Sequence, residues 1–238
     1  ELVGFAARAL CTVRGKGLMK KAVICFTRVP VPGKTKTRLM PLLGGKNCAR
    51  LHTAFLQDLA DVYRQLDADL FVAYAPEPHW EPLREIFPFA RGFLEQQGAD
   101  LGQRMDNALR WVLARGYAAC VLTGSDLPLL GKAHFEAAFA ALEGADLVIG
   151  PSRDGGYYLI GMKRPCTAIF VNQHYGGATV YEQTCRAAGR VGRTIQSTLP
   201  CEDVDTPGDL QRLWRSAAPD SHTAALLRQL VKEGYSFD

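Results

Sequence analysis

Short apolar runs alternate with amphipathic stretches along most of the chain. Apolar runs bounded by turn residues predict strands at 22–27, 69–75, 91–96, 118–123, 145–150, 157–162 and 191–199. Stretches with apolar residues at helical spacing predict helices at 46–66, 100–115, 132–143, 177–188, 206–215 and 224–233. This alternation indicates an α/β fold whose mixed sheet is mainly parallel and is covered by helices. The run at 157–162 follows its predecessor too closely for a crossover helix, so we expect a neighbouring strand of different direction.

In such sheets ligands bind beyond the carboxyl ends of the strands, so the residues that follow each strand are the first candidates for a site. The first strand leads into a basic region: eight basic residues and no acidic one lie between Lys20 and Gln57, whereas the whole chain has a net charge of only +4. The charge is therefore a local patch.

The loop RVPVPGKTKTRL places Lys34, Lys36 and Arg38 at alternating positions. On an extended backbone they would project to one side, where they could bind a di- or triphosphate and act as the catalytic cations. Arg28 could add a fourth cation, and Gly33 would permit close approach of the backbone. The competing interpretation is an ordinary solvated basic loop.

Two acidic segments are candidates for a metal site. Asp126 in TGSDLPLL directly follows the strand at 118–123, where a carboxylate can bind Mg²⁺ or Mn²⁺. Its proposed partner comes from CEDVDTPGDL, in which Asp203 and Asp205 alternate. On an extended backbone they face opposite ways, so at most one of them should reach the metal. Alternatively, Asp126 caps the next turn or helix, and Asp205 is only the N-cap of the helix that follows.

The segment SRDGGYYLIG is a candidate acceptor site. Gly155 and Gly156 permit close approach of the backbone, Asp154 can accept hydrogen bonds from hydroxyl groups, and Tyr157 or Tyr158 can stack on a ring. The alternative, a Gly-Gly turn that joins two strands, explains the segment locally as well.

A further anion contact is predicted in QQGADLGQRMDNAL, where Arg104 lies in the first turn of a helix. The basic loop matches neither GxxxxGK[ST] nor GxGxxG, which argues against a P-loop ATPase and against nicotinamide dinucleotide binding.

Composition indicates an ordinary globular protein, with 47% hydrophobic and 22% charged residues among 238. The longest apolar runs are too short to cross a bilayer, and seven scattered cysteines without CxxC spacing argue against zinc and disulfides. The five histidines are unclustered and are expected to be surface or core residues. We therefore expect a cytoplasmic protein without a membrane partner. Residues 1–18 are predicted to be a disordered or added extension, and 19–238 a single domain.

Five segments in this order, PGKTKTRL, DLGQRM, GSDLP, DGGYYLIG and DVDTPGDL, resemble the GT-A-fold nucleotide-diphospho-sugar transferase superfamily. The nearest branch is that of the radical-SAM/selenodomain-associated glycosyltransferases. The resemblance implies a Rossmann-like GT-A fold with helices on both faces, a nucleotide near Lys34, Lys36 and Arg38, and Mg²⁺ or Mn²⁺ on Asp126 and Asp205. It also implies an acceptor pocket from Asp154 to Tyr157.

Two departures leave the reaction open. The GGxGxR loop of sugar nucleotidyltransferases is missing, and RVPVPGKTKTRL is closer to the K-x-R-L pattern of 2-phospholactate guanylyltransferases. In place of a DxD pair the chain has Ser125-Asp126. The main hypothesis is metal-dependent transfer from a nucleotide-activated donor, such as a nucleotide sugar, to a small acceptor. The alternatives are nucleotidyl transfer from an NTP to a phosphorylated acceptor, a non-catalytic nucleotide-binding module and, more weakly, RNA binding, which the loop's lack of aromatic residues disfavours.

Overall fold

The computed structural model describes residues 20–237, so the expectation for residues 1–18 lies outside the described chain. Within it, seven strands form one sheet in the order β3-β2-β1-β4-β6-β5-β7. Their bounds are β1 Lys21–Thr27, β2 Asp69–Tyr74, β3 Gly92–Glu95, β4 Ala119–Thr123, β5 Leu147–Pro151, β6 Tyr157–Met162 and β7 Ile195–Ser197. Only β6 runs antiparallel to its neighbours β4 and β5. The predicted mixed sheet and the reversed strand at 157–162 are confirmed.

The α-helices are α1 Met40–Tyr63, α2 Pro82–Ile86, α3 Leu101–Leu113, α4 Lys132–Gly144, α5 Val180–Arg190, α6 Pro207–Ser216 and α7 His222–Lys232. Helix α1 begins at Met40, six residues before the predicted start, because Pro41 is tolerated in a first turn. The non-helical backbone of Gly44 then kinks the helix. The short helix α2 was not predicted, because five residues are too few to show helical periodicity.

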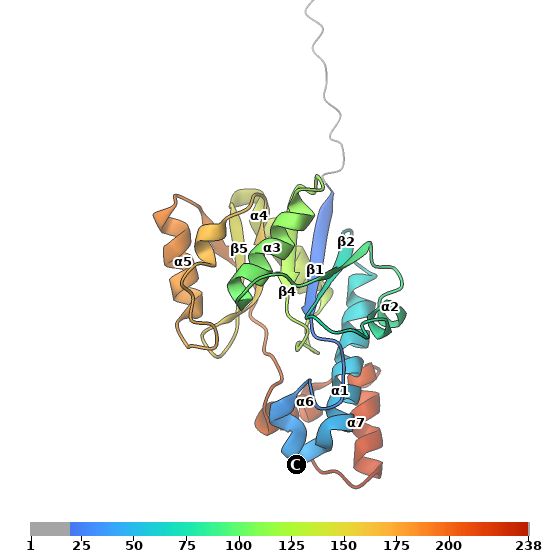
Figure 1. The fold of residues 1–238 in the computed structure, drawn as a ribbon. Coiled ribbons are helices and arrows are strands. Elements are labelled where there is room, and N and C mark those ends of the chain that lie inside the picture. The colour runs from blue at the N-terminus through green and yellow to red at the C-terminus, as the bar shows by residue number, and fades with distance from the viewer. Residues whose placement is uncertain (1–19, 238) are drawn as a thin grey trace, which may run out of the picture.

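Helices cover both faces of the sheet (Figure 1). Val23 and Cys25 of β1 pack with residues of α1, α2 and α4, whereas the alternate residues Ala22 and Ile24 pack with α3 and α5. This alternation follows from the two-residue period of a strand. Among the described residues no helix combines the length and apolar character needed to span a bilayer, and the six described cysteines are unbonded.

A third apolar cluster lies beyond the carboxyl end of β1. Leu43 and Phe55 of α1 pack there with Leu210 of α6 and Leu227 of α7, and these three helices lie side by side (Figure 1). The cluster includes Val204, whose backbone N–H donates to the Asp126 carbonyl at 2.9 Å. Packing of α6 and α7 therefore brings the segment before α6 back to the loop after β4.

Candidate active site

A cavity of about 910 Å³ opens at the carboxyl ends of the central parallel strands. Its walls come from the loop after β1, the ends of β2 and β3, the start of α3, the loop after β4, the β5–β6 turn, and the segments before α5 and α6. Most segments singled out in the sequence therefore meet at one place, where an α/β sheet is expected to bind its ligand.

Lys36 turns inward from the basic loop. Its backbone is left-handed, with φ 51° and ψ 42°, and its side chain is only 1% exposed. The ammonium nitrogen lies 2.7 Å from Asp126 Oδ1 and 3.3 Å from Asp205 Oδ1, and it donates to the Val204 carbonyl at 2.6 Å. It also lies 5.1 Å from the centre of the Phe55 ring. Lys36 therefore binds the two aspartates that were predicted to hold a metal.

The expectation that Lys34, Lys36 and Arg38 project to one side is wrong. The left-handed backbone at Lys36 and the 3₁₀ turn Thr37–Leu39 end the extended alternation. Lys34 is 61% exposed and pairs with Glu77 at 2.7 Å, and Arg38 is 74% exposed and lies 3.9 Å from Asp205. All three residues line the cavity, with Lys34 and Arg38 toward solvent and Lys36 toward the interior.

Asp126 lines the cavity and does not cap helix α4, whose N-cap position belongs to Gly131. Its Oδ1 is buried against Lys36, and 3.4 Å away lies Nδ1 of the buried His52. The side chain as a whole is 40% exposed, so Oδ2 is the oxygen that faces the cavity. Burial raises the pKa of Asp126, but Lys36 and His52 outweigh it and hold this pKa well below its usual range.

The sequence interpretation missed His52. Its Nε2 lies 3.2 Å from both Thr27 Oγ1 and the Arg28 carbonyl, which fixes the imidazole between β1 and Asp126. A signal was present, since His52, Leu56 and Leu59 share the i, i+4, i+7 spacing of a buried helix face. The histidine was expected to be a core or surface residue, and it is a core residue at the cavity wall.

Asp203 and Asp205 both line the cavity, so the expectation that they face opposite ways is wrong. Residues 201–205 have irregular backbone, so the alternation of an extended strand does not apply. Asp205 is not the N-cap of α6, because Thr206 accepts the capping hydrogen bond from the Asp209 N–H. Burial raises the pKa of Asp203 to about 6, and the nearby carboxylates of Asp205, Asp154 and Asp126 contribute to this rise.

The carboxylates have the chemistry that a divalent cation requires. Lys36 places one positive charge between Asp126 and Asp205, and the neighbouring carboxylates add to the rise that burial causes in the pKa of Asp203. Among residues 20–237, however, no group of three acidic, histidine or cysteine side chains is arranged to hold a metal by itself. The site therefore fits a cation whose remaining ligands come from a substrate or water.

The predicted acceptor segment contributes in part. Asp154, Gly156 and Tyr157 line the cavity, and Asp154 Oδ1 accepts the Gly156 N–H at 3.0 Å within the turn from β5 to β6. Gly155 lies outside the lining: its φ is +85°, and a Cβ there would collide with the Ala178 carbonyl oxygen. Burial raises the pKa of Tyr157 well above its usual value, and contact with Tyr175 raises it further. Tyr157 is therefore a neutral hydrogen-bonding group.

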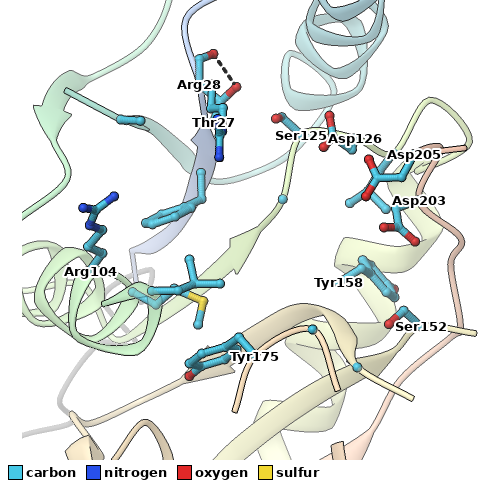
Figure 2. Close-up of a pocket in the computed structure, with 18 of the residues that line it drawn as sticks. Thr27, Arg28, Arg104, Ser125, Asp126, Ser152, Tyr158, Tyr175, Asp203 and Asp205 are labelled. Carbon is cyan, nitrogen blue, oxygen red and sulfur yellow. Dashed lines mark hydrogen bonds between the residues drawn. The ribbon is translucent and has the colours of Figure 1, made fainter. Parts of the chain in front are cut away.

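Two of the arginines that line the cavity, Arg28 and Arg104, lie apart from the carboxylates of Asp126, Asp203 and Asp205. Figure 2 shows Arg28 and Arg104 on one side and Asp126, Asp203 and Asp205 together on the other. Arg104 Nε donates to the Gly98 carbonyl at 3.0 Å, which fixes the guanidinium at the cavity wall. Gly33 is not part of the lining; it forms a turn against which Gly45 packs.

The chain is similar to several known proteins. The 2-phospho-L-lactate guanylyltransferase of Methanothermobacter thermautotrophicus is 30% identical over 82% of this chain and 85% of its own length. That of Methanocaldococcus jannaschii is 26% identical over 90% of both chains. A crystal structure from Desulfovibrio desulfuricans G20, provisionally assigned to the nucleotide-diphospho-sugar transferases, is 34% identical, covers 89% of this chain and 95% of its own, and has a TM-score of 0.82.

Fold, site and relatives together define a transferase of the GT-A-like nucleotide-diphospho-sugar transferase and nucleotidyltransferase superfamily. Within it, the chain belongs to the family described as "Uncharacterized protein conserved in bacteria (DUF2064)", whose model matches residues 58–177.

Proposed function

We propose that the protein is a nucleotidyltransferase that joins the nucleoside monophosphate of an NTP to a small phosphorylated acceptor and releases pyrophosphate. The observation that carries this proposal is the number and spread of cations in one cavity: Arg28, Lys34 and Arg38 come from the loop after β1, and Arg104 comes from α3. Four cationic side chains on two elements suit two anionic reactants better than one sugar nucleotide and a neutral hydroxyl acceptor.

The reaction needs little proton transfer. An oxygen of the acceptor phosphate attacks the α-phosphorus of the NTP, and the bond from that phosphorus to the oxygen bridging to the β-phosphate breaks. The attacking phosphate is already ionised near neutral pH, so no general base is needed. The contribution of Arg28, Lys34 and Arg38 is to bind the triphosphate and to stabilise the charge that develops on the departing pyrophosphate.

The acidic side of the cavity complements this role. Asp126 and Asp205, with Asp203 beside them, would hold Mg²⁺ or Mn²⁺. A bound divalent ion supplies neutralisation of charge on the triphosphate oxygens. Asp154 and Tyr157 line the same cavity and would orient the acceptor by hydrogen bonds.

The relatives support a phosphorylated acid as acceptor, because two of them are guanylyltransferases of 2-phospho-L-lactate. The first experiment incubates the protein and Mg²⁺ with each of the four NTPs and a panel of phosphorylated acids and sugars that includes 2-phospho-L-lactate. Pyrophosphate release that requires both reactants, with a nucleotide-acceptor product in the mass spectrum, is the expected result.

Glycosyl transfer is the second candidate, because the 34% identical crystal structure is assigned to nucleotide-diphospho-sugar transferases. It is tested in parallel with sugar nucleotides and acceptors that carry hydroxyl groups. If the sugar-nucleotide reactions release a nucleoside diphosphate and none of the NTP reactions releases pyrophosphate, glycosyl transfer replaces our proposal. Nucleotide binding without any product would instead indicate a non-catalytic module.

A further inference from the structure

The environment of Lys36 differs from that of every other cation at the cavity. Its ammonium group donates hydrogen bonds to the Val204 carbonyl and to Asp205 Oδ1, and it forms an ion pair with Asp126 Oδ1 at 2.7 Å. The Phe55 ring covers the same group. A lysine whose ammonium group is enclosed by these partners and only 1% exposed is not available to bind the phosphates of a nucleotide.

The carboxylates stand between Lys36 and the cavity. The Lys36 side chain is 1% exposed, whereas those of Asp126 and Asp205 are 40% and 37% exposed. Asp126 Oδ1 is buried on the lysine side, so the second oxygen of Asp126 points into the open space. Lys36 therefore orients these two side chains from the side that faces away from the open cavity.

The left-handed backbone of Lys36 supports a specific role. For a residue with a Cβ this conformation costs on the order of 1 kcal/mol or more, and it persists only where other contacts hold it. Here those contacts are the ones to Asp126, Asp205 and Val204, which link the loop after β1 to the loop after β4 and to the segment before α6.

We infer that Lys36 is a positioning residue that makes divalent metal binding dependent on nucleotide. This inference rests on the nucleotide-dependent function proposed above. Lys36 holds the outer oxygens of Asp126 and Asp205 toward the cavity, and its fixed positive charge repels a bare divalent ion. Because no three described acidic, histidine or cysteine side chains form a complete metal site, the missing ligands and the missing negative charge come from the triphosphate.

The test is a titration with Mn²⁺ followed by electron paramagnetic resonance, without and with a non-hydrolysable NTP analogue. For the unmodified protein we expect Mn²⁺ to bind at least tenfold more tightly when the analogue is present. This measurement uses the unmodified protein, so it tests whether Mn²⁺ binding depends on the nucleotide even if a substituted protein fails to fold. Equal Mn²⁺ affinity without the analogue would overturn the inference.

Lys36→Met keeps the length of the side chain and removes the charge. It should bind Mn²⁺ without nucleotide at least tenfold more tightly than the unmodified protein, and the further change Asp126→Asn should abolish this gain. The matched control is Lys34→Met on the same loop, whose partner is Glu77 and which should leave nucleotide-free Mn²⁺ binding unchanged. Unchanged Mn²⁺ binding in a folded Lys36→Met protein would contradict the inference.

Steady-state kinetics separate positioning from phosphate binding. A positioning role predicts that Lys36→Met lowers kcat at least tenfold and changes KM for the NTP less than threefold, whereas a phosphate contact would mainly raise KM. The two proposals can be refuted separately. If Lys36→Met gains Mn²⁺ binding but the unmodified protein turns over no NTP, the proposed nucleotidyl transfer is wrong. If the unmodified protein turns over an NTP but Lys36→Met binds Mn²⁺ no more tightly, the proposed role of Lys36 is wrong.

Discussion

The basic and acidic sides of the cavity are held in place in different ways. On the basic side, Lys34 and Arg38 are exposed; Lys34 pairs with Glu77, and Arg38 reaches across to Asp205 of the acidic side at 3.9 Å. On the acidic side, a backbone hydrogen bond joins Val204 to Asp126, and Lys36 joins Asp126 to Asp205. Exposed ion pairs contribute little stability and exchange readily, whereas buried and linked ones fix geometry. The comparison indicates that the basic side adapts to a substrate and the acidic side is preorganised.

Asp126→Asn should have the largest effect, because it alters the most connected residue of the acidic side. The amide keeps the shape but loses the charge that pairs with Lys36, so we expect kcat for pyrophosphate release to fall on the order of 100-fold. The matched control is Asp220→Asn, an exposed residue outside the cavity lining. Activity within threefold of the unmodified protein would show that Asp126 is structural.

Gly155→Ala tests whether backbone packing holds the wall that carries Asp154 and Tyr157. The added Cβ would collide with the Ala178 carbonyl oxygen, and a positive φ is itself unfavourable for alanine. The free energy of unfolding, measured in urea, should therefore fall by about 2–4 kcal/mol. Gly116→Ala has nearly the same φ, +86°, with open space around the Cβ, and should cost only about 1 kcal/mol. Equal losses would mean that the contact with Ala178 contributes nothing.

Arg38→Ala tests the adaptable side. Because its guanidinium is exposed, we expect the folded state to keep its stability and KM for the NTP to rise roughly tenfold, the loss expected for one charge-assisted hydrogen bond. The rise should shrink at high salt, which screens exposed charges. Lys132→Ala removes an equal charge from α4, outside this cavity, and should leave KM unchanged. A similar rise in both variants would point to net charge instead of a contact.

Sequence patterns predicted most of the fold and less of the site geometry. Strand residues such as Val23 and Ile24 are buried on opposite faces of the sheet, so a short continuous apolar run was sufficient to find β1. The inward turn of Lys36 depends on a left-handed residue within the loop and on carboxylates some 90 and 169 positions away, which no local pattern encodes. His52 was missed for the same reason, because its role comes from a partner on another element.

The smallest expected effect concerns Asp209, which holds the backbone beside Asp205. Its Oδ2 accepts the N–H of Thr206 at 2.7 Å and that of Asp205 at 3.1 Å. Burial raises the pKa of Asp209, but the hydrogen bonds from Thr206 and Asp205 lower it below the ordinary 3.8. The ionised form is therefore favoured by folding, so its stabilisation is present above the ordinary pKa and is lost as pH falls through the lower, folded value.

We expect Asp209→Asn to lose about 1 kcal/mol of unfolding free energy near neutral pH, and the difference from the unmodified protein to shrink as the pH is lowered below about 4. Ser221→Ala is the comparison, because it removes the capping hydroxyl of another helix, α7, which does not titrate in this range. Urea unfolding at several pH values measures both. A pH-independent difference for Asp209→Asn would mean that the charge does not matter. The acidic side would then be held in place at this point by capping geometry alone.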